Sequence, residues 1–289
     1  MKVSGFTFIR NAVLLDYPIV AAIQSILPLC DEIVVAVGNS TDDTLGLIQN
    51  IDPKVRIIQT TWDDTLRENG RVLAVETDKA LAAINPEADW AIYIQGDEVM
   101  HEADHPEILK AMTRFQHDQD VDGLLFDYLH FYGSYDYIGV SNNWYKKEIR
   151  VVKPGRGIFS FRDAQGFRKT PDQKLKVAPA NARVFHYGWV KDPQAMQRKQ
   201  ESFHKLWHDD AWLEKNIKVA TAFDYEDHIH ELARFEGTHP QWITERIVER
   251  NWTFQTDISR NKKSFKNKIK DLLKAIGIDT HYANYTLIR

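Results

Sequence analysis

The chain has 289 residues, enough for one large α/β domain with an appendage or for two domains of roughly 150 residues. Its hydrophobic content of 43% and charged content of 27% exclude intrinsic disorder. The formal net charge is −4, so no overall positive field draws the chain to nucleic acid. A single cysteine, Cys30, excludes an intramolecular disulfide and a multi-cysteine metal cluster.

Cysteine usage and hydropathy also indicate a compartment. The first residues alternate apolar and polar side chains and reach Arg10 quickly, so they do not resemble a signal peptide. No run approaches the ~18 consecutive apolar residues that a membrane span needs. We therefore expect a cytoplasmic protein.

The first hundred residues alternate between apolar runs and segments with helical spacing. The pattern predicts strands at 3–9, 32–37, 55–60 and 90–95, with helices at 18–29, 44–50 and 67–84 between them. Strands separated by helices form parallel sheets. The sequence therefore predicts an α/β fold with a mostly parallel central sheet flanked by helices.

The pattern changes after a predicted helix at 106–117. Aromatic runs at 123–132 and 144–153 predict added mixed or antiparallel strands, and 182–190 predicts one more strand. Residues 154–181 are rich in Gly, Pro and charge, and we interpret them as a long functional loop with a short strand at 158–161. The chain is helical and polar after Asp192, which suggests one domain at 1–190 and a helical C-terminal region at 191–289.

Polar residues directly follow several predicted strands, where open α/β sheets bind ligands. The carboxylates of Asp97 and Glu98 follow an apolar strand and suit Mg²⁺ or Mn²⁺ bridging the phosphates of a nucleotide. The alternative is that both residues cap a following helix. His186 ends the last predicted strand and either completes a metal shell or is a hydrogen-bonded core residue.

These residues, in this order, resemble the nucleotide-sugar-dependent glycosyltransferases of family 2, which have the GT-A fold. The resemblance is carried by Arg10–Asn11, by 32–44 (EIVVAVGNSTDDT), by 68–71 (ENGR) and by 89–99 (DWAIYIQGDEV), and it extends loosely through 186–189. Two positions depart from the family. Val37–Gly38 stands where an aspartate usually holds the nucleobase, and Gln95 stands where the Asp-any-Asp metal motif usually begins.

The resemblance implies a GT-A-like domain at 1–190 that binds a nucleotide sugar and carries catalysis, with a divalent cation, Mn²⁺ or Mg²⁺, as cofactor. Asp97 and His186 would bind the metal. The nucleotide-sugar pocket would be lined by Phe8, Arg10, Gly38, Arg71 and Gln95. Lone arginines are otherwise solvated surface charges.

An inverting transfer also needs a carboxylate that takes the proton of the acceptor hydroxyl. The family places this base in the loop after the aromatic strands, which favours Asp163; Asp127, Glu148 and Asp172 are the alternatives. An aromatic group near the presumed acceptor cleft either stacks on sugar rings or belongs to the core. Its members are Phe131, Tyr132, Tyr135, Trp144 and Tyr145.

Residues 260–276 place apolar side chains on one helical stripe, with seven Lys or Arg against one Asp on the rest. Such a helix either contacts an anionic membrane at its inner face, as a lipid-linked acceptor would require, or packs on the domain with a solvated basic face.

We therefore expect an inverting, metal-dependent hexosyltransferase of polysaccharide biosynthesis. It would move a sugar from a nucleotide-diphosphate donor to a hydroxyl of a glycan or lipid-linked acceptor, without nucleic acid as a partner. One alternative is a non-catalytic nucleotide-sugar or glycan-binding module that retains the fold. The other is a metal-dependent hydrolase that uses Asp97, Glu98, His101, Glu102, Asp104 and His105.

Overall fold

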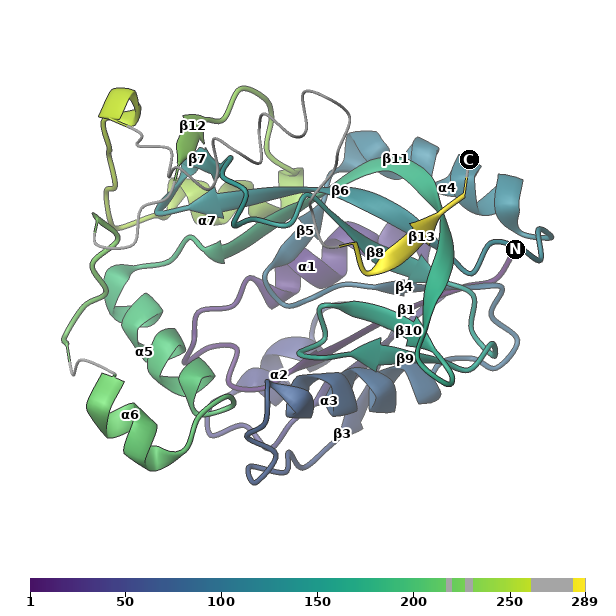
Figure 1. Cartoon of the computed structure of the whole chain (residues 1–289), viewed down its shortest axis with the longest axis horizontal. Coiled ribbons are helices and arrows are strands. Elements are labelled where there is room, and N and C mark those ends of the chain that lie inside the picture. The colour runs from purple at the N-terminus through teal and green to yellow at the C-terminus, as the bar shows by residue number, and fades with distance from the viewer. Residues whose placement is uncertain (217–219, 227–230, 261–282, 289) are drawn as a thin grey trace.

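The computed structural model describes residues 1–216, 220–226, 231–260 and 283–288. Its centre is a large mixed sheet with helices on both faces (Figure 1). Four parallel strands stand in the order β3–β2–β1–β4, namely β1 (Val3–Ile9), β2 (Glu32–Val37), β3 (Val55–Gln59) and β4 (Trp90–Tyr93). The prediction of an α/β fold with a central sheet flanked by helices is confirmed.

Helices α1 (Ile19–Ile26), α2 (Thr44–Gln49) and α3 (Arg71–Ala82) connect these strands, as the spacing predicts. Two of them are shorter than expected. Residues 27–29, which include Pro28, form the 3-10 turn η1 (Leu27–Leu29) after α1. Helix α3 begins at Arg71 and not at residue 67, because Asn69 and Gly70 have φ angles of 51° and 66° and so cannot be helical.

The second half of the chain extends the sheet beyond β4. Strand β8 (Lys147–Val152) pairs antiparallel with β4 and with β6 (Gly123–Tyr132), and β6 runs parallel to β11 (Gln173–Trp189). The short strand β5 (Glu98–Met100) pairs with β11, and β7 (Ser134–Gly139) pairs with β6. Helix α4 (His105–Phe115) follows β5. No helix follows Asp97 and Glu98 directly, so the interpretation of this pair as a helix cap is wrong.

The expectation of a long loop at 154–181 is also wrong, although the short strand predicted within it at 158–161 is confirmed as β9. Strands β9 (Ile158–Phe161) and β10 (Gly166–Lys169) form an antiparallel hairpin, and β11 already begins at Gln173. Along the start of β11, Leu175 and Val177 are buried while Lys174 and Lys176 are exposed, which is the alternation of a half-buried strand. The predicted strand at 182–190 is therefore the second half of one long strand.

Residues after 190 contribute both helices and strands. The helices are α5 (Pro193–His204), α6 (Asp210–Asn216) and α7 (Thr244–Val248), with the 3-10 turns η4 (Gln241–Ile243) and η5 (Ile258–Arg260). A further 3-10 turn, η2 (Glu102–Asp104), precedes α4. Strands β12 (Leu232–Arg234) and β13 (Tyr285–Leu287) join the sheet through β7 and β11. Nearly all of the predicted basic helix at 260–276 lies outside the described residues, so it stays a prediction. Across the described ranges, no helix is both long and apolar enough to cross a bilayer.

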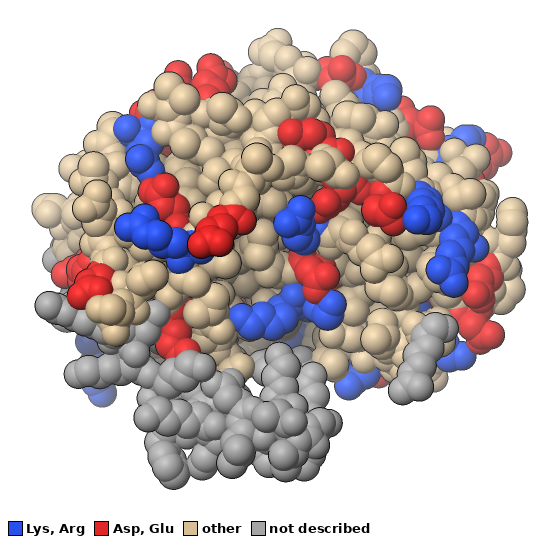
Figure 2. All heavy atoms as spheres, turned by 90° about the horizontal axis from the view of Figure 1, so that it is seen from above, with Lys and Arg blue, Asp and Glu red and all other residues tan. Residues whose placement is uncertain are grey.

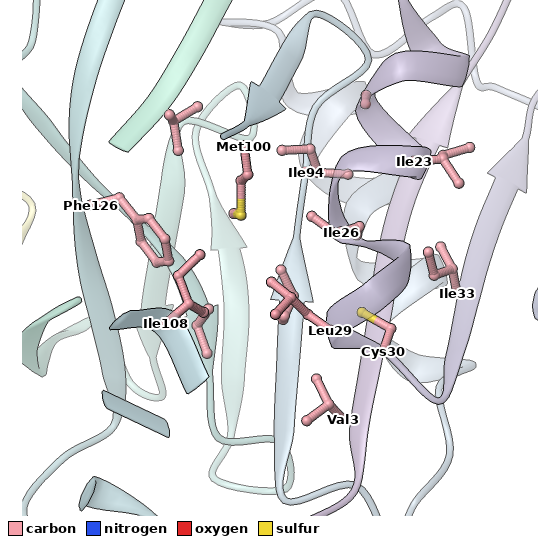
Figure 3. Packing of buried hydrophobic residues seen from close by; sticks show 14 of the residues in the cluster. Val3, Ile23, Ile26, Leu29, Cys30, Ile33, Ile94, Met100, Ile108 and Phe126 are labelled. Atoms are coloured by element: carbon pink, nitrogen blue, oxygen red, sulfur yellow. The ribbon is translucent and has the colours of Figure 1, made fainter. Parts of the chain in front are cut away.

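The two faces of the sheet carry separate cores because successive strand residues point to opposite sides. On β2, Ile33 and Val35 belong to the core that also includes Met100 and Phe126. Figure 3 shows Ile33 beside α1 and Phe126 beside Ile108 of α4. Val34 and Ala36 belong to the other core, which α3 and the β9–β10 hairpin cover. Both cores leave the carboxyl ends of the parallel strands as the polar edge of the sheet.

Surface charge on the face seen from above is mixed. Figure 2 shows Lys and Arg side chains interspersed with Asp and Glu over this face. This distribution agrees with the net charge of −4 and gives this face no broad basic surface for nucleic acid.

A fully buried ion pair joins β5 to β8. Glu98 accepts two hydrogen bonds from Arg150, at 2.8 and 2.7 Å. It accepts one more from the Tyr128 hydroxyl at 2.7 Å and one from the Gln95 backbone N–H at 3.1 Å. Arg150 in turn donates to the backbone oxygens of Ile149 and Gln165. Every oxygen of the carboxylate and every nitrogen of the guanidinium therefore has a partner, which is the condition under which a buried pair is tolerated.

Breaking this pair should destabilise the protein strongly. Replacing Glu98 by alanine leaves a buried guanidinium without its counterion, so we expect the free energy of unfolding to fall by roughly 3–5 kcal/mol. Urea denaturation measures the change. The matched control is Lys147→Ala, which removes the exposed pair with Asp127 and should cost at most about 1 kcal/mol. Equal losses in the two variants would contradict the structural role of Glu98.

Candidate active site

The carboxyl ends of β1, β2 and β4 meet at one edge of the sheet. The Gly38 amide donates to the Ile9 carbonyl at 2.8 Å, and a Cβ on Gly96 would lie 2.9 Å from the Ile9 side chain. This edge carries polar side chains because the strands stop there and the apolar cores end with them.

Asp97 lies between β4 and β5, and its two carboxylate oxygens have different neighbours. Oδ2 accepts a hydrogen bond from the ammonium of Lys199 at 2.9 Å, while Oδ1 lies 3.8 Å from His186 Nε2. Burial by itself opposes ionisation, but Lys199, His186 and Lys191 together hold the pKa of this carboxyl well below its usual range. Asp97 is therefore an ionised carboxylate in a nearly dry setting. The structure brings Asp97 and His186 together, as the sequence predicts.

Lys199 comes from α5 and was missed by the sequence analysis. Its ammonium also donates to the Gly188 carbonyl at 2.8 Å and lies 5.1 Å from the centre of the Tyr17 ring. Gly188 is needed here because a Cβ at this position would lie 2.8 Å from Asp97 Oδ2. A single lysine in a polar helix, about a hundred residues after Asp97, gives no sequence signal of this contact.

A second lysine is buried beside the first. Lys191 donates to the Asp16 carbonyl and lies 4.5 Å from the centre of the Tyr17 ring, and Arg246 pairs with the Asp16 carboxylate at 2.5 Å. Burial lowers the pKa of Lys191 well below its usual value. This cluster anchors the segment after β1 against α7.

Asp163 lies in the turn between β9 and β10, and the side chains of Gln95 and Arg150 hold that turn. The Gln95 side-chain amide donates to the Ala164 carbonyl at 2.9 Å, and the Arg150 guanidinium donates to the Gln165 carbonyl at 3.0 Å. Arg162 and Ala164 have φ angles of 58° and 63°, so the turn is tight. Burial raises the pKa of Asp163. Its Cβ lies 2.8 Å from where a Cβ on Gly70 would be, at the start of α3.

The three alternative bases have different surroundings. Asp127 is exposed and pairs with Lys147, and Asp172 is exposed at the end of the hairpin. Glu148 is buried and accepts a hydrogen bond from the Ile149 amide at 2.9 Å, while burial raises its pKa to about 7. Asp163 therefore remains the candidate base, held at the sheet edge by Gln95.

Three of the five residues predicted to line the nucleotide pocket lie around Trp62, which the sequence analysis did not single out. The Phe8 ring lies 5.8 Å from the Trp62 ring, and the Arg10 guanidinium lies 5.5 Å from its centre and pairs with Asp64 at 2.6 Å. A Cβ on Gly38 would lie 2.4 Å from Trp62 Nε1, so only glycine fits. Trp62 Nε1 is buried, and no hydrogen-bond acceptor contacts it among the residues that the structure describes.

Arg71 lies apart from this group as the first residue of α3. It is exposed and makes no ion pair within the described part of the chain. Its predicted contact with sugar or phosphate stays a prediction.

For three of the five aromatic residues near the presumed acceptor cleft, the structure supports the alternative that they belong to the core. Phe131, Tyr132 and Tyr135 are buried in the cores, where Phe131 stacks on Phe185 and Tyr187, so they cannot stack on a sugar. Trp144 and Tyr145 are half-buried and pack against His130.

The side chains of the predicted hydrolase cluster also point elsewhere. His101 contacts Thr238, His105 contacts the Ser25 carbonyl and Asp104 pairs with Arg183. Within the described ranges, no three His, Cys, Asp or Glu side chains converge as a metal site. The hydrolase interpretation is therefore wrong.

No family model and no curated protein matches the sequence. Among solved structures, the chain is similar to *S. aureus* TarS 1–349 in complex with UDP, with 14% identity, a TM-score of 0.39, and coverage of 76% of this chain and 68% of that chain.

It is also similar to glucosyl-3-phosphoglycerate synthase from *Mycobacterium tuberculosis* in complex with Mn²⁺, UDP and glucosyl-3-phosphoglycerate, with 20% identity, a TM-score of 0.30, and coverage of 46% and 45%. A third is 4-diphosphocytidyl-2C-methyl-D-erythritol synthase from *Anaerococcus prevotii* DSM 20548, with 10% identity, a TM-score of 0.33, and coverage of 53% and 71%. Each TM-score is below 0.5, so these likenesses do not extend to what this chain binds or does.

The raised pKa of Glu148 predicts a pH-dependent stability. In the unfolded chain this carboxyl ionises near its ordinary pKa of about 4.3, whereas in the folded protein it holds its proton up to about pH 7. The unfolded state therefore binds fewer protons over this interval, and stability falls as pH rises through it. In Glu148→Gln this loss is absent, so the variant should gain roughly 2–3 kcal/mol relative to wild type between pH 5 and pH 8. Urea denaturation at both pH values measures this; parallel curves for the two proteins would contradict it.

Proposed function

We propose that this chain is a glycosyltransferase that moves a sugar from a nucleotide-diphosphate donor to a hydroxyl of a glycan or lipid-linked acceptor. The observation that supports it is the convergence of Asp97, His186 and Lys199 at the carboxyl ends of the strands. The turn that carries Asp163 is fixed at the same edge by Gln95. In open α/β sheets this edge is where nucleotides bind. The sequence resemblance to family 2 implies Asp97 and His186 as metal ligands and Asp163 as the catalytic base.

The residues at this edge have roles that fit an inverting transfer. The bond between the sugar C1 and the β-phosphate oxygen breaks, and the electron pair leaves with that oxygen. The acceptor oxygen forms the new bond to C1 from the opposite face, and its proton goes to the carboxylate of Asp163. The Lys199 ammonium would stabilise the negative charge that develops on the leaving diphosphate.

A divalent cation fits the donor set beside Lys199. Asp97 Oδ1 is an oxygen donor of the kind that Mn²⁺ and Mg²⁺ prefer, and His186 Nε2 would add a nitrogen donor 3.8 Å away from it. Lys199 binds the other oxygen, Oδ2, and so leaves Oδ1 available. When bound, the cation would act as a Lewis acid on the diphosphate. Phe8, Arg10, Gly38 and Trp62 would hold the nucleoside.

The acceptor and the place of action are also proposals. A lipid-linked acceptor in polysaccharide biosynthesis would bring a cytoplasmic enzyme to the inner face of a membrane, and the basic segment 260–276 would make that contact.

Substitution of the two aspartates should separate donor binding from catalysis. In Asp97→Ala we expect no transfer and weaker donor binding in the presence of Mn²⁺, because the diphosphate site loses its carboxylate. In Asp163→Asn we expect transfer to slow by about 10²–10⁴-fold with donor affinity retained, because only the proton acceptor is lost. Turnover and donor titrations with purified protein measure both. Full activity of the Asp97 variant would overturn its assignment, and tight donor binding by wild type without turnover would favour the non-catalytic module.

Lys199 should contribute to donor binding through its charge. Hydrogen bonds to charged groups are worth about 1.5–3 kcal/mol, so Lys199→Ala should weaken binding of a nucleoside diphosphate roughly 10–100-fold. Calorimetric titration with UDP, GDP and CDP measures the change for whichever binds wild type best. The control is Lys205→Ala, an exposed lysine at the end of the same helix, which should bind like wild type. Wild-type affinity in Lys199→Ala would refute the role.

A further inference from the structure

Helix α5 and the turns that follow it lie beside both aspartates of the sheet edge. Lys199, within the helix, donates to Asp97 Oδ2 at 2.9 Å. Trp207, eight positions further along, lies next to the other aspartate. A Cβ on Gly70 would lie 2.8 Å from Asp163 Cβ and 3.1 Å from Trp207 Cε2, so both side chains crowd the same point at the start of α3. One segment of chain therefore reaches from Asp97 to Asp163.

The indole of Trp207 is held in this place by the packing of its segment. The Gly70 amide donates to the Leu206 carbonyl at 3.2 Å, which ties the residue before Trp207 to the start of α3. The Phe203 ring lies 5.9 Å from the Trp207 ring and supports it from within α5. The Trp207 side chain is half-buried, so part of it stays open to solvent beside Asp163.

The indole nitrogen of Trp207 has no protein partner. Trp207 Nε1 is buried and contacts no hydrogen-bond acceptor among the residues that the structure describes. Buried donors in native proteins nearly always have a partner, so one without a partner calls for an explanation such as a bound group.

The stereochemistry of an inverting transfer places the acceptor on the same side as Trp207. The diphosphate leaves from one face of the sugar C1, and the acceptor hydroxyl attacks from the opposite face. Lys199 and Asp97 lie at the diphosphate, whereas Asp163 takes the proton of the acceptor. A side chain next to Asp163 therefore borders the acceptor, and Gly70 contributes no side chain there.

We propose that Trp207 forms the acceptor subsite, where its indole packs on a pyranose ring and sets one hydroxyl of that ring against the Asp163 carboxylate. An indole suits this role because its wide apolar face covers the C–H groups of a sugar ring while its N–H serves a hydroxyl. The acceptor group is then a sugar. The role of Asp163 as base rests on the proposed function, but the contact between a sugar and Trp207 does not.

Two substitutions at position 207 separate the aromatic face from the rest of the segment. Trp207→Phe keeps a smaller aromatic face, and Trp207→Ala removes it. The matched control is Trp212→Ala on α6, which removes a half-buried tryptophan of the same segment whose ring stacks on His208 at 3.5 Å. Thermal melting of all variants reports whether each is folded.

NMR spectra of the tryptophan indole N–H groups test the sugar contact without any turnover. The signals of Trp207 and Trp212 are identified by their absence in Trp207→Phe and Trp212→Ala. The probes are the methyl glycosides of β-D-glucose, β-D-galactose and N-acetyl-β-D-glucosamine, each with and without UDP, and glycerol is the control polyol. We expect at least one glycoside to shift the Trp207 signal saturably and to leave the Trp212 signal in place. No shift with any glycoside, or an equal shift with glycerol, would overturn the proposal.

The ratio of sugar transfer to donor hydrolysis tests the consequence for catalysis, with the glycoside that shifts Trp207 as acceptor. Water attacks the donor sugar without stacking on a ring, so loss of the indole should affect transfer more than hydrolysis. In Trp207→Ala we expect the KM for the glycoside to rise roughly 2–10-fold and the ratio to fall by a similar factor. Trp207→Phe should lie between this variant and wild type, and Trp212→Ala should equal wild type.

The outcomes separate this inference from the proposed function. Equal losses of transfer and hydrolysis in Trp207→Ala would mean that the ring only positions Asp163, and would overturn the acceptor role. The same ratio change in Trp212→Ala would overturn it as well, because the effect would then belong to the segment. Glycoside binding at Trp207 without transfer from any UDP-, GDP- or CDP-linked sugar would instead overturn the proposed function and support the sugar contact.

Discussion

The buried pair of Glu98 and Arg150 is the constraint on which the sheet edge depends. Its hydrogen bonds join the end of β4, strand β5, strand β8 and the turn that carries Asp163. Glu98, the first residue of β5, is directed into the interior, while Asp97 in the turn before it faces His186 and Lys199. A buried guanidinium requires a full set of acceptors, and that requirement fixes the geometry around it.

Asp97 divides its two oxygens between a lysine and a histidine, and this division gives the edge its polarity. The ammonium of Lys199 donates to Oδ2, while the imidazole of His186 lies 3.8 Å from Oδ1. In the proposed function, Lys199 would present its positive charge to a phosphate, and Asp97 with His186 would present donor atoms to a cation. Burial strengthens both effects because little water screens them.

The sequence predicted those parts of the molecule that depend on local pattern. Strands β1 to β4 and their helices follow from apolar runs and helical spacing, and Asp97 and His186 follow from their place at strand ends. Strand β10 and the first half of β11 were missed because glycines, charges and Pro171 hide strands whose stability comes from pairing. Lys199 was missed because one lysine in a polar helix has no pattern that identifies its partner.

The sequence by itself determined that the chain folds as a sheet flanked by helices, with carboxylates placed where β4 ends. Only the tertiary structure decided that Glu98 turns inward while Asp97 meets Lys199 and His186, and that Gln95 holds the turn beside Asp163. Strand and helix patterns arise from neighbours a few residues apart, whereas these contacts join segments separated by up to about a hundred residues. Their partners are selected by the desolvation of charge in the folded interior, which no local window of sequence contains.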